Sequence, residues 1–176
     1  GPMAEARFRL SDLSKAKVNA DRDKLKAAMT AMESLDRQQL STAEQVYYDT
    51  IEFYGETASV GYSFPYGGGI YPSPYTVSQL TGSYQVVPDF LDSQHRIEAA
   101  DDAEAYLSRL SAFAKGLDQE RERMADDYAA GAVPPDFVID RTLTQMEALL
   151  GTEAAASGMA TSLARRTAAK GIAGDW

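Results

Sequence analysis

Residues 57–87 read TASVGYSFPYGGGIYPSPYTVSQLTGSYQVV, and the rest of the chain is organised around this stretch. It contains no Asp, Glu, Lys or Arg, although 24% of the whole chain is charged. Prolines fix φ and remove an amide donor, and consecutive glycines free the backbone, so we expect no helix to cross residues 61–75. The stretch also lacks the charge of a disordered linker. The sequence therefore predicts a long ordered loop, called here the tyrosine-rich loop.

The aromatic residues of this loop leave two interpretations open. Tyrosine buries a large apolar ring and keeps a polar tip, so the loop is expected to lie against other groups. It either packs over the helices or shapes a surface for a ligand or partner, since long loops in compact domains are commonly covers or binding loops. Under the second interpretation the candidate residues are Tyr62, Phe64, Tyr66, Tyr71, Tyr75, Gln79 and Tyr84.

Apolar residues spaced by three and four positions predict helices on both sides of the loop. The expected helices cover residues 20–35, 42–58, 88–94, 101–130, 135–150 and 157–169, and the first two form a hairpin. Ser41 and Glu44 have the spacing of a capping box. β-Branched and aromatic residues at 76–80 and 84–87 leave a short β-hairpin open as an alternative. The predicted fold class is mostly α: a helical hairpin, further packed helices and a long ordered loop rich in Gly, Pro and Tyr.

Length and composition restrict the class of protein. The chain has 176 residues, enough for one domain with its own core. A net charge of −9 argues against non-specific binding to nucleic acid or anionic membranes. There is no cysteine, hence no disulfide and no thiolate metal site. We expect residues 1–2 to be a tag remnant, 3–151 a helical N-terminal domain, and 152–176 the Ala- and Gly-rich start of the next helical segment of a longer protein.

The ionisable residues form no recognisable catalytic pattern. His95 is the only histidine, and one histidine supplies neither a zinc site nor a catalytic triad. We interpret it as a surface or capping residue between two helices. Asp101-Asp102 has the position of a helix cap, and Asp126-Asp127 is interpreted as a solvated helix face. The sequence thus predicts no catalytic residue, no metal ligand and no cofactor in this chain.

Several short motifs occur in the order found in a bacterial family catalogued as domain of unknown function 885. They are LDRQQLS at 35–41 leading into Tyr48-Asp49, AYLSRL at 105–110, and GAVPP at 131–135 opening a helix that reaches Gln145. The chain resembles the N-terminal region of that family. The resemblance implies a helical, gluzincin-type zinc metallopeptidase several times longer than this chain, bacterial and exported or periplasmic. Its H-E-x-x-H motif is absent here, so no zinc ligand is carried over.

Two functions follow as alternatives. The resemblance implies a structural and substrate-cleft-forming N-terminal portion of a zinc-metallopeptidase-like hydrolase, whose partner is the remainder of its own polypeptide and whose zinc lies elsewhere. The alternative is a self-contained helical module that binds a protein through the tyrosine-rich loop. In either case two apolar stripes exceed what a short bundle can bury, so we expect exposed apolar surface and self-association. The stripes are Tyr47/Ile51/Tyr54 and Ile139/Leu143/Met146/Leu150.

Overall fold

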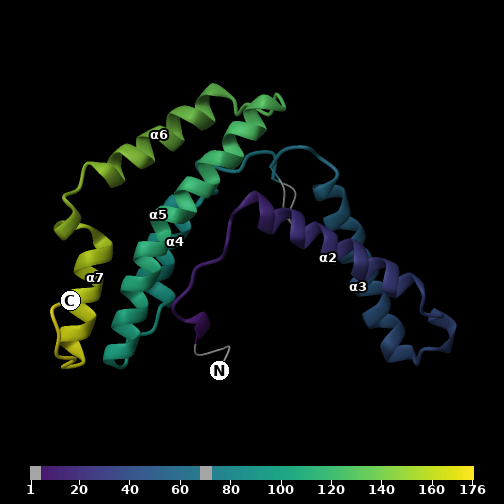
Figure 1. The fold of residues 1–176 in the computed structure, drawn as a ribbon, viewed down its shortest axis with the longest axis horizontal. Coiled ribbons are helices and arrows are strands. Elements are labelled where there is room, and N and C mark those ends of the chain that lie inside the picture. Colours follow the sequence, from purple (N-terminus) through teal and green to yellow (C-terminus); the bar gives the residue numbers. More distant parts are fainter. Residues whose placement is uncertain (1–4, 68–72) are drawn as a thin grey trace. The chain divides into compact units, whose positions relative to one another are not determined.

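The computed structural model describes residues 5–67 and 73–176, and it is mostly α, as the periodicity predicts (Figure 1). The longer helices are α2 (Lys15–Glu33), α3 (Thr42–Tyr62), α4 (Ser83–Asp89), α5 (Ala100–Ala129), α6 (Asp136–Leu150) and α7 (Gly158–Ala169). Three short turns accompany them: the 3₁₀ turns η1 (Arg37–Gln39) and η3 (Ala154–Ala156) and the π-helical turn η2 (Phe90–Gln94).

These elements form two compact units. Unit 1 consists of the described part of Gly1–Asp12 together with Val77–Glu122 and Pro134–Trp176. Unit 2 consists of Leu13–Thr76, as far as described, and Arg123–Val133. Residue 151 lies within the range 134–176 of unit 1, and the domain boundary expected there stays a prediction.

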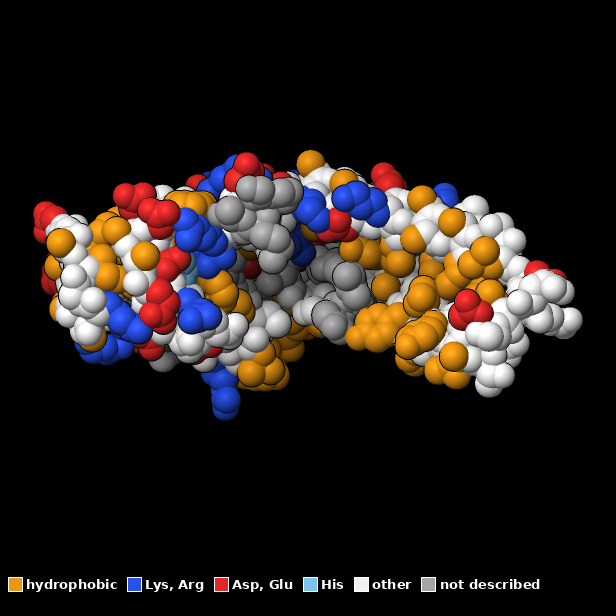
Figure 2. Space-filling model, turned by 90° about the horizontal axis from the view of Figure 1, so that it is seen from below, with side chains coloured by type: hydrophobic (Ala, Val, Ile, Leu, Met, Phe, Trp, Pro, Cys, Tyr) orange, Lys and Arg blue, Asp and Glu red, His pale blue; other side chains and the backbone are white. Residues whose placement is uncertain are grey.

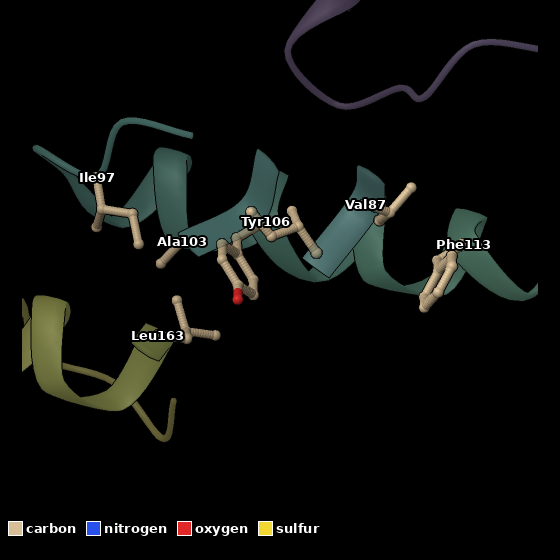
Figure 3. Close-up of a cluster of buried hydrophobic side chains, with 7 residues drawn as sticks. Val87, Ile97, Ala103, Tyr106, Phe113 and Leu163 are labelled. Atoms are coloured by element: carbon tan, nitrogen blue, oxygen red, sulfur yellow. The ribbon is translucent and has the colours of Figure 1, made fainter. Parts of the chain in front are cut away.

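Unit 1 has a core of large apolar side chains. Tyr106 lies at its centre, is fully excluded from solvent, and donates a hydrogen bond from its hydroxyl to the Met159 carbonyl oxygen at 2.7 Å. Leu163 approaches the same cluster from α7 (Figure 3). The apolar residues of α5 at helical spacing, Tyr106, Leu110, Phe113 and Leu117, all belong to this core or pack against it. Its buried members are Val87, Leu91, Ile97, Ala103, Tyr106, Phe113 and Leu163.

The alternative of a β-hairpin in residues 76–87 is wrong. Only one isolated bridge, Ser78 with Thr81, occurs there, and Ser83 begins helix α4. The reason is a tertiary cap: the buried carboxylate of Glu120 on α5 accepts the Ser83 amide through both oxygens, at 2.9 and 3.0 Å. Gly82, at the N-cap position, has no side chain with which to cap the helix itself. The helix start is therefore determined by a residue 37 positions away.

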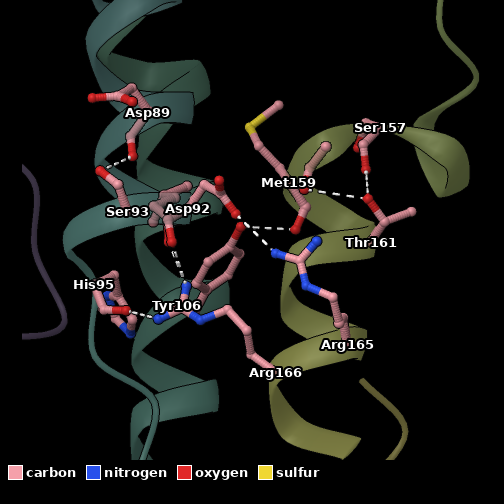
Figure 4. Close-up of polar contacts among 12 residues, drawn as sticks. Asp89, Asp92, Ser93, His95, Tyr106, Ser157, Met159, Thr161, Arg165 and Arg166 are labelled. Carbon is pink, nitrogen blue, oxygen red and sulfur yellow. Dashed lines mark hydrogen bonds and ion pairs between the residues drawn. The ribbon is translucent and has the colours of Figure 1, made fainter. Parts of the chain in front are cut away.

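The prediction that Pro88 lies in the first turn of a helix is also wrong. Pro88 is the sixth residue of α4, where its missing amide leaves one helical bond unmade. The chain continues into η2, whose end is closed by Arg166 of α7. The guanidinium donates to the carbonyl oxygens of Leu91, at 2.9 Å, of Asp92, at 3.0 Å, and of His95 (Figure 4). A cation at a helical C-terminus satisfies carbonyl groups that have no partner within the turn.

The single histidine has a structural role at the end of η2. His95 is the C-cap residue of η2, as the capping interpretation predicts, but it is buried rather than on the surface. Its Nδ1 lies 2.7 Å from an Arg109 amino group, and its Nε2 lies 2.9 Å from the Asp102 carbonyl oxygen. Because a guanidinium only donates, Nδ1 is the acceptor and Nε2–H is the donor. His95 is therefore held as the neutral tautomer, and burial lowers its pKa below the ordinary value, assisted by the charge of Arg109.

Unit 2 contains the predicted hairpin of α2 and α3. The capping box at the start of α3 is confirmed: Glu44 accepts the Ser41 amide at 2.8 Å, and the Ser41 hydroxyl accepts the Glu44 amide at 3.4 Å. The helices approach closely at Gly55, where an added Cβ would lie 1.9 Å from the Met29 sulfur. Gly55, Ala58 and Gly61 are the buried residues of α3, so small side chains form the contact face.

The expected exposure of both apolar stripes is confirmed, with one exception. Tyr47, Ile51 and Tyr54 of α3 are exposed, as are Ile139, Leu143 and Leu150 of α6. Met146 is half-buried. Self-association itself stays a prediction. Among the described residues, no helix is long and apolar enough to cross a membrane.

Candidate functional site

A cavity of about 200 Å³ lies in unit 2, between the start of α2, the first part of the tyrosine-rich loop and the last turn of α5. The side chains of Tyr62, Phe64 and Tyr66 line one wall. Lining residues from α2 and α5 are Lys15, Val18, Asn19, Arg22, Arg123, Asp126 and Asp127, and Pro65 and Gly67 complete the set.

The loop wall of this cavity is held by Asp127. This carboxylate accepts the Gly67 amide at 2.8 Å through one oxygen and the Thr76 hydroxyl at 2.6 Å through the other. Asp127 is only 7% exposed, so the interpretation of Asp126-Asp127 as a solvated face is wrong for this residue. Adjacent helical positions point in different directions. Asp126 remains exposed and pairs with Lys15 at 2.5 Å.

Gly67 is required by the conformation of the loop. Its φ is +65°, and a Cβ there would lie 2.0 Å from the Ser73 carbonyl oxygen. A side chain at this position would clash with backbone, which cannot move aside cheaply. Arg123 donates to the Gly67 carbonyl oxygen at 2.6 Å. The amide and the carbonyl of this one glycine are therefore both tied to α5.

One of the cations on the cavity wall, Arg22, has no partner among the described residues. The lining contains the cations Lys15, Arg22 and Arg123 and the carboxylates Asp126 and Asp127. Lys15 pairs with Asp126, and Asp127 is engaged by the loop. Within the described part of the chain, Arg22 makes no hydrogen bond or ion pair. Its guanidinium is thus available to an anionic group entering the cavity.

The aromatic wall offers flat apolar surface beside this cation. The rings of Phe64 and Tyr66 contact each other with centroids 5.6 Å apart and planes tilted by 34°. Phe64 is 48% exposed. Burial is the main cause that raises the pKa of the Tyr62 phenol, so its hydroxyl stays protonated at neutral pH and can donate a hydrogen bond.

The seven predicted site residues do not form one site. Tyr62, Phe64 and Tyr66 line the cavity, whereas Tyr75, also in unit 2, is half-buried outside the lining. Tyr71 lies outside the described residues. Gln79 and Tyr84 belong to unit 1.

In unit 1 these two residues join a polar network on α4 and α6. The Tyr84 hydroxyl contacts the Ser78 carbonyl oxygen at 2.8 Å and the Gln145 amide oxygen at 2.6 Å. Gln85 donates to the Gln79 carbonyl oxygen at 2.6 Å and to the same Gln145 oxygen at 2.8 Å. These bonds fix the segment before α4 against α6, which is a structural role.

Sequence reasoning missed the charged half of the cavity. Arg22, Arg123 and Asp127 lie on helices, far from the loop in sequence. Only the absence of charge in residues 57–88 could have indicated that the polar partners of the loop come from elsewhere in the chain.

The described residues do not form a group of side chains suited to a metal ion. No group of three or more His, Cys, Asp or Glu side chains in residues 5–67 and 73–176 could hold a metal ion. Both ring nitrogens of His95 are already engaged by Asp102 and Arg109. The described residues therefore do not fit a zinc ion.

Comparison with known proteins identifies a bacterial family. Residues 3–174 match the model of the family described as "Bacterial protein of unknown function (DUF885)". Searches of the curated proteins and of the solved structures returned no match.

Proposed function

Because the chain belongs to the DUF885 family of bacterial proteins of unknown function, we propose that it forms the N-terminal, substrate-binding portion of a zinc-metallopeptidase-like hydrolase. The zinc chemistry of such an enzyme belongs to residues outside this chain, since the described residues do not fit the ion. The contribution proposed for this chain is to hold part of a peptide.

The observation that carries the proposal is the cavity of unit 2. Its volume of about 200 Å³ lies below the range of drug-sized ligand sites, roughly 300–1,000 Å³, and suits a single residue of a peptide. Tyr62, Phe64 and Tyr66 supply the apolar wall, and Arg22 supplies a cation with fork geometry for a carboxylate. An aromatic or apolar residue with a carboxylate, as at a peptide C-terminus, matches both features.

Binding can be tested on the chain itself. We expect N-acetylphenylalanine to shift the NMR signals of Tyr62, Tyr66 and Arg22, and its carboxamide analogue to bind more weakly because it lacks the charge. Arg22→Ala should remove the difference between the two probes. Equal binding of both probes to the unmodified chain would contradict the role of Arg22, and shifts confined to other residues would contradict the site.

A second test uses peptide hydrolysis by the full-length protein. Truncating an aromatic anchor at a binding site typically costs more than about 1 kcal/mol, so Tyr66→Ala should raise KM roughly fivefold while the melting temperature changes little. Tyr128→Ala is the matched control, because Tyr128 belongs to unit 2, is 73% exposed and does not line the cavity. Unchanged KM together with a lowered melting temperature would show that Tyr66 only supports the loop.

The alternative, a helical module that binds a protein partner through the tyrosine-rich loop, stays a prediction. The exposed face of α3 is a further surface that favours such a module.

A further inference from the structure

Helix α3 carries a row of exposed residues at coiled-coil spacing. Val46, Phe53 and Val60 recur every seven residues and are 62%, 69% and 57% exposed. Thr50 and Thr57 lie between them, so that successive members are separated by four and three positions. We call Val46, Thr50, Phe53, Thr57 and Val60 the α3 seam. Figure 2 shows hydrophobic side chains gathered over the part of the surface formed by α2 and α3.

The two threonines do not make this seam polar. The Thr50 hydroxyl donates to the Val46 carbonyl oxygen at 2.7 Å, and the Thr57 hydroxyl donates to the Phe53 carbonyl oxygen at 2.8 Å. A hydroxyl bonded to the carbonyl four residues earlier has its donor satisfied within the helix. The seam is therefore a continuous apolar row with its polar groups satisfied inside the helix. Alternating steps of four and three are the pattern that receives a second helix by knobs-into-holes packing.

One edge of the seam is acidic. Asp49, Glu52 and Glu56 fall on the same side of α3, next to Phe53 and Val60. Asp49 is paired with Arg37 through two bonds of 2.6 Å. Glu52 and Glu56 form no ion pair within the described residues. Residues 42–62 contain four acidic residues and no Lys or Arg, so the edge carries negative charge that α3 itself does not compensate.

From this seam and its acidic edge we propose that α3 is a docking site for an amphipathic helix of a partner protein, with apolar residues at coiled-coil spacing and Lys or Arg along one edge. Charges flanking an apolar seam select the partner and its orientation. A second copy of α3 has no cation to place opposite Glu52 and Glu56, so the charge pattern does not favour pairing of two α3 helices. This surface is separate from the cavity lined by Tyr62, Phe64 and Tyr66, and the proposal does not depend on peptide hydrolysis.

The probe is a pair of synthetic helical peptides of 21 residues, about the length of α3. Both carry Leu at the two seam positions of each heptad, and they differ only along one edge, which is Lys in one peptide and Glu in the other. We expect the Lys-edged peptide to bind roughly tenfold more tightly in a fluorescence anisotropy titration at low salt, and the preference to shrink at high salt.

Two variants make the test specific. Phe53→Ser should weaken binding of the Lys-edged peptide by about tenfold or more, because it removes the central aromatic anchor. Leu150→Ser is the matched control, since Leu150 is 83% exposed in unit 1 and lies outside the seam. The double variant Glu52→Lys/Glu56→Lys should reverse the preference in favour of the Glu-edged peptide. Non-specific apolar adhesion would not produce this reversal. Far-UV circular dichroism checks that each variant keeps its helices.

Three outcomes would overturn the proposal. Equal binding of both peptides would show non-specific apolar adhesion. Sedimentation of the chain as a dimer that Phe53→Ser dissociates would assign the seam to a second copy. Absence of binding by a monomeric, folded chain would show that no separate helix docks there. Tyr66→Ala should leave peptide docking unchanged, so failure here and failure of the cavity proposal can be distinguished.

Discussion

In unit 1 the side chains of Leu91 and Tyr106 are fully excluded from solvent, whereas in unit 2 those of Tyr47 and Phe53 are 70% and 69% exposed. The buried residues of α3 are two glycines and an alanine. Both units are helical and both contain aromatic residues. Tyr106 points into the core of unit 1, whereas Tyr47 and Phe53 of unit 2 face solvent. Unit 1 buries Tyr106 and its neighbours in a core of its own, although Ile139, Leu143 and Leu150 of α6 stay exposed. In unit 2, α3 presents its large side chains outward.

The difference has an energetic consequence. Burial of apolar surface contributes roughly 25 cal/mol per Å², so the large buried rings favour folding of unit 1 far more than Gly55 and Ala58 favour folding of unit 2. Unit 2 also has caps and polar tethers, such as the Ser41 capping box and the bonds of Asp127. Because its aromatic residues are not buried in a core, they are available for binding, both at the cavity and on the α3 seam.

The strongest test of this contrast is the Tyr106→Ala substitution. Removing a fully buried ring should lower the free energy of unfolding of unit 1 by about 3–5 kcal/mol. Trp176, the only tryptophan, packs against the same core, so its fluorescence during urea unfolding reports on unit 1. Tyr106→Phe is the control and should cost about 1 kcal/mol, for the lost hydrogen bond to Met159. An equal effect of both substitutions would mean that the ring is not packed as described.

In unit 2 the largest effect is expected at Asp127. Asp127→Asn replaces one of two accepting oxygens with an amide, and leaving a buried donor unpaired costs about 1–3 kcal/mol. Hydrogen exchange at the Gly67 amide should quicken accordingly, since that amide donates to Asp127. The neighbouring change Asp126→Asn removes only an exposed ion pair with Lys15 and should cost less than about 1 kcal/mol. Similar exchange at Gly67 in the two variants would contradict the assignment of the tether.

Packing between α2 and α3 can be tested at Gly55. A Cβ at this position overlaps the Met29 sulfur, and overpacking costs about 1–3 kcal/mol. Replacing a helical glycine by alanine gains about 1 kcal/mol in propensity, so Gly55→Ala should destabilise unit 2 by a net amount of about 1 kcal/mol. Hydrogen exchange of the α2 and α3 amides measures this loss of stability. Gly158→Ala, where nothing lies within 4 Å of the added carbon, is the control without a clash. A stabilised Gly55→Ala variant would mean that the hairpin is loosely packed.

The smallest predicted effect is a pH dependence confined to unit 1. Burial, with the charge of Arg109, lowers the folded-state pKa of His95 below its unfolded value of about 6.5. Below that pH the unfolded chain binds the proton more readily, so stability declines as pH falls from about 6.5 toward the lower folded-state pKa. Protonation of His95 at Nδ1 would place an N–H group against the Arg109 guanidinium. Nδ1 could then no longer accept the hydrogen bond from Arg109.

The Trp176 unfolding transition between pH 5 and 7 measures this dependence. His95 is the only histidine in the chain, so His95→Gln should flatten the profile in this window. The carboxylates of unit 1 with lowered pKa, Asp102 and Glu98, act only at lower pH, where protonation removes stability that is present above their unfolded pKa values. A slope that persists in His95→Gln would assign it to another group.

Much of the helical framework follows from local pattern. The stripe of Tyr106, Leu110, Phe113 and Leu117 predicts α5 and its buried face, and Ser41 with Glu44 predicts the start of α3. These features depend on neighbours three or four residues away, so they can be predicted from the sequence alone. The start of α4 does not follow in this way, because its first amide is capped by Glu120 from another helix.

The same distinction applies to the candidate sites. Tyr62, Phe64 and Tyr66 stand out in an uncharged segment, and the two exposed stripes exceed what a short bundle can cover, so the sequence alone indicates recognition surface. Which residues complete that surface depended on the tertiary structure: Arg22 from α2 joins the aromatic wall, and the adjacent pair Asp126 and Asp127 divides into a solvated and a buried carboxylate. Helical periodicity orients a side chain on its own element. Its environment is set by residues distant in sequence that folding brings within hydrogen-bonding range. Asp127 is an example, because its burial follows from its bonds to Gly67 and Thr76.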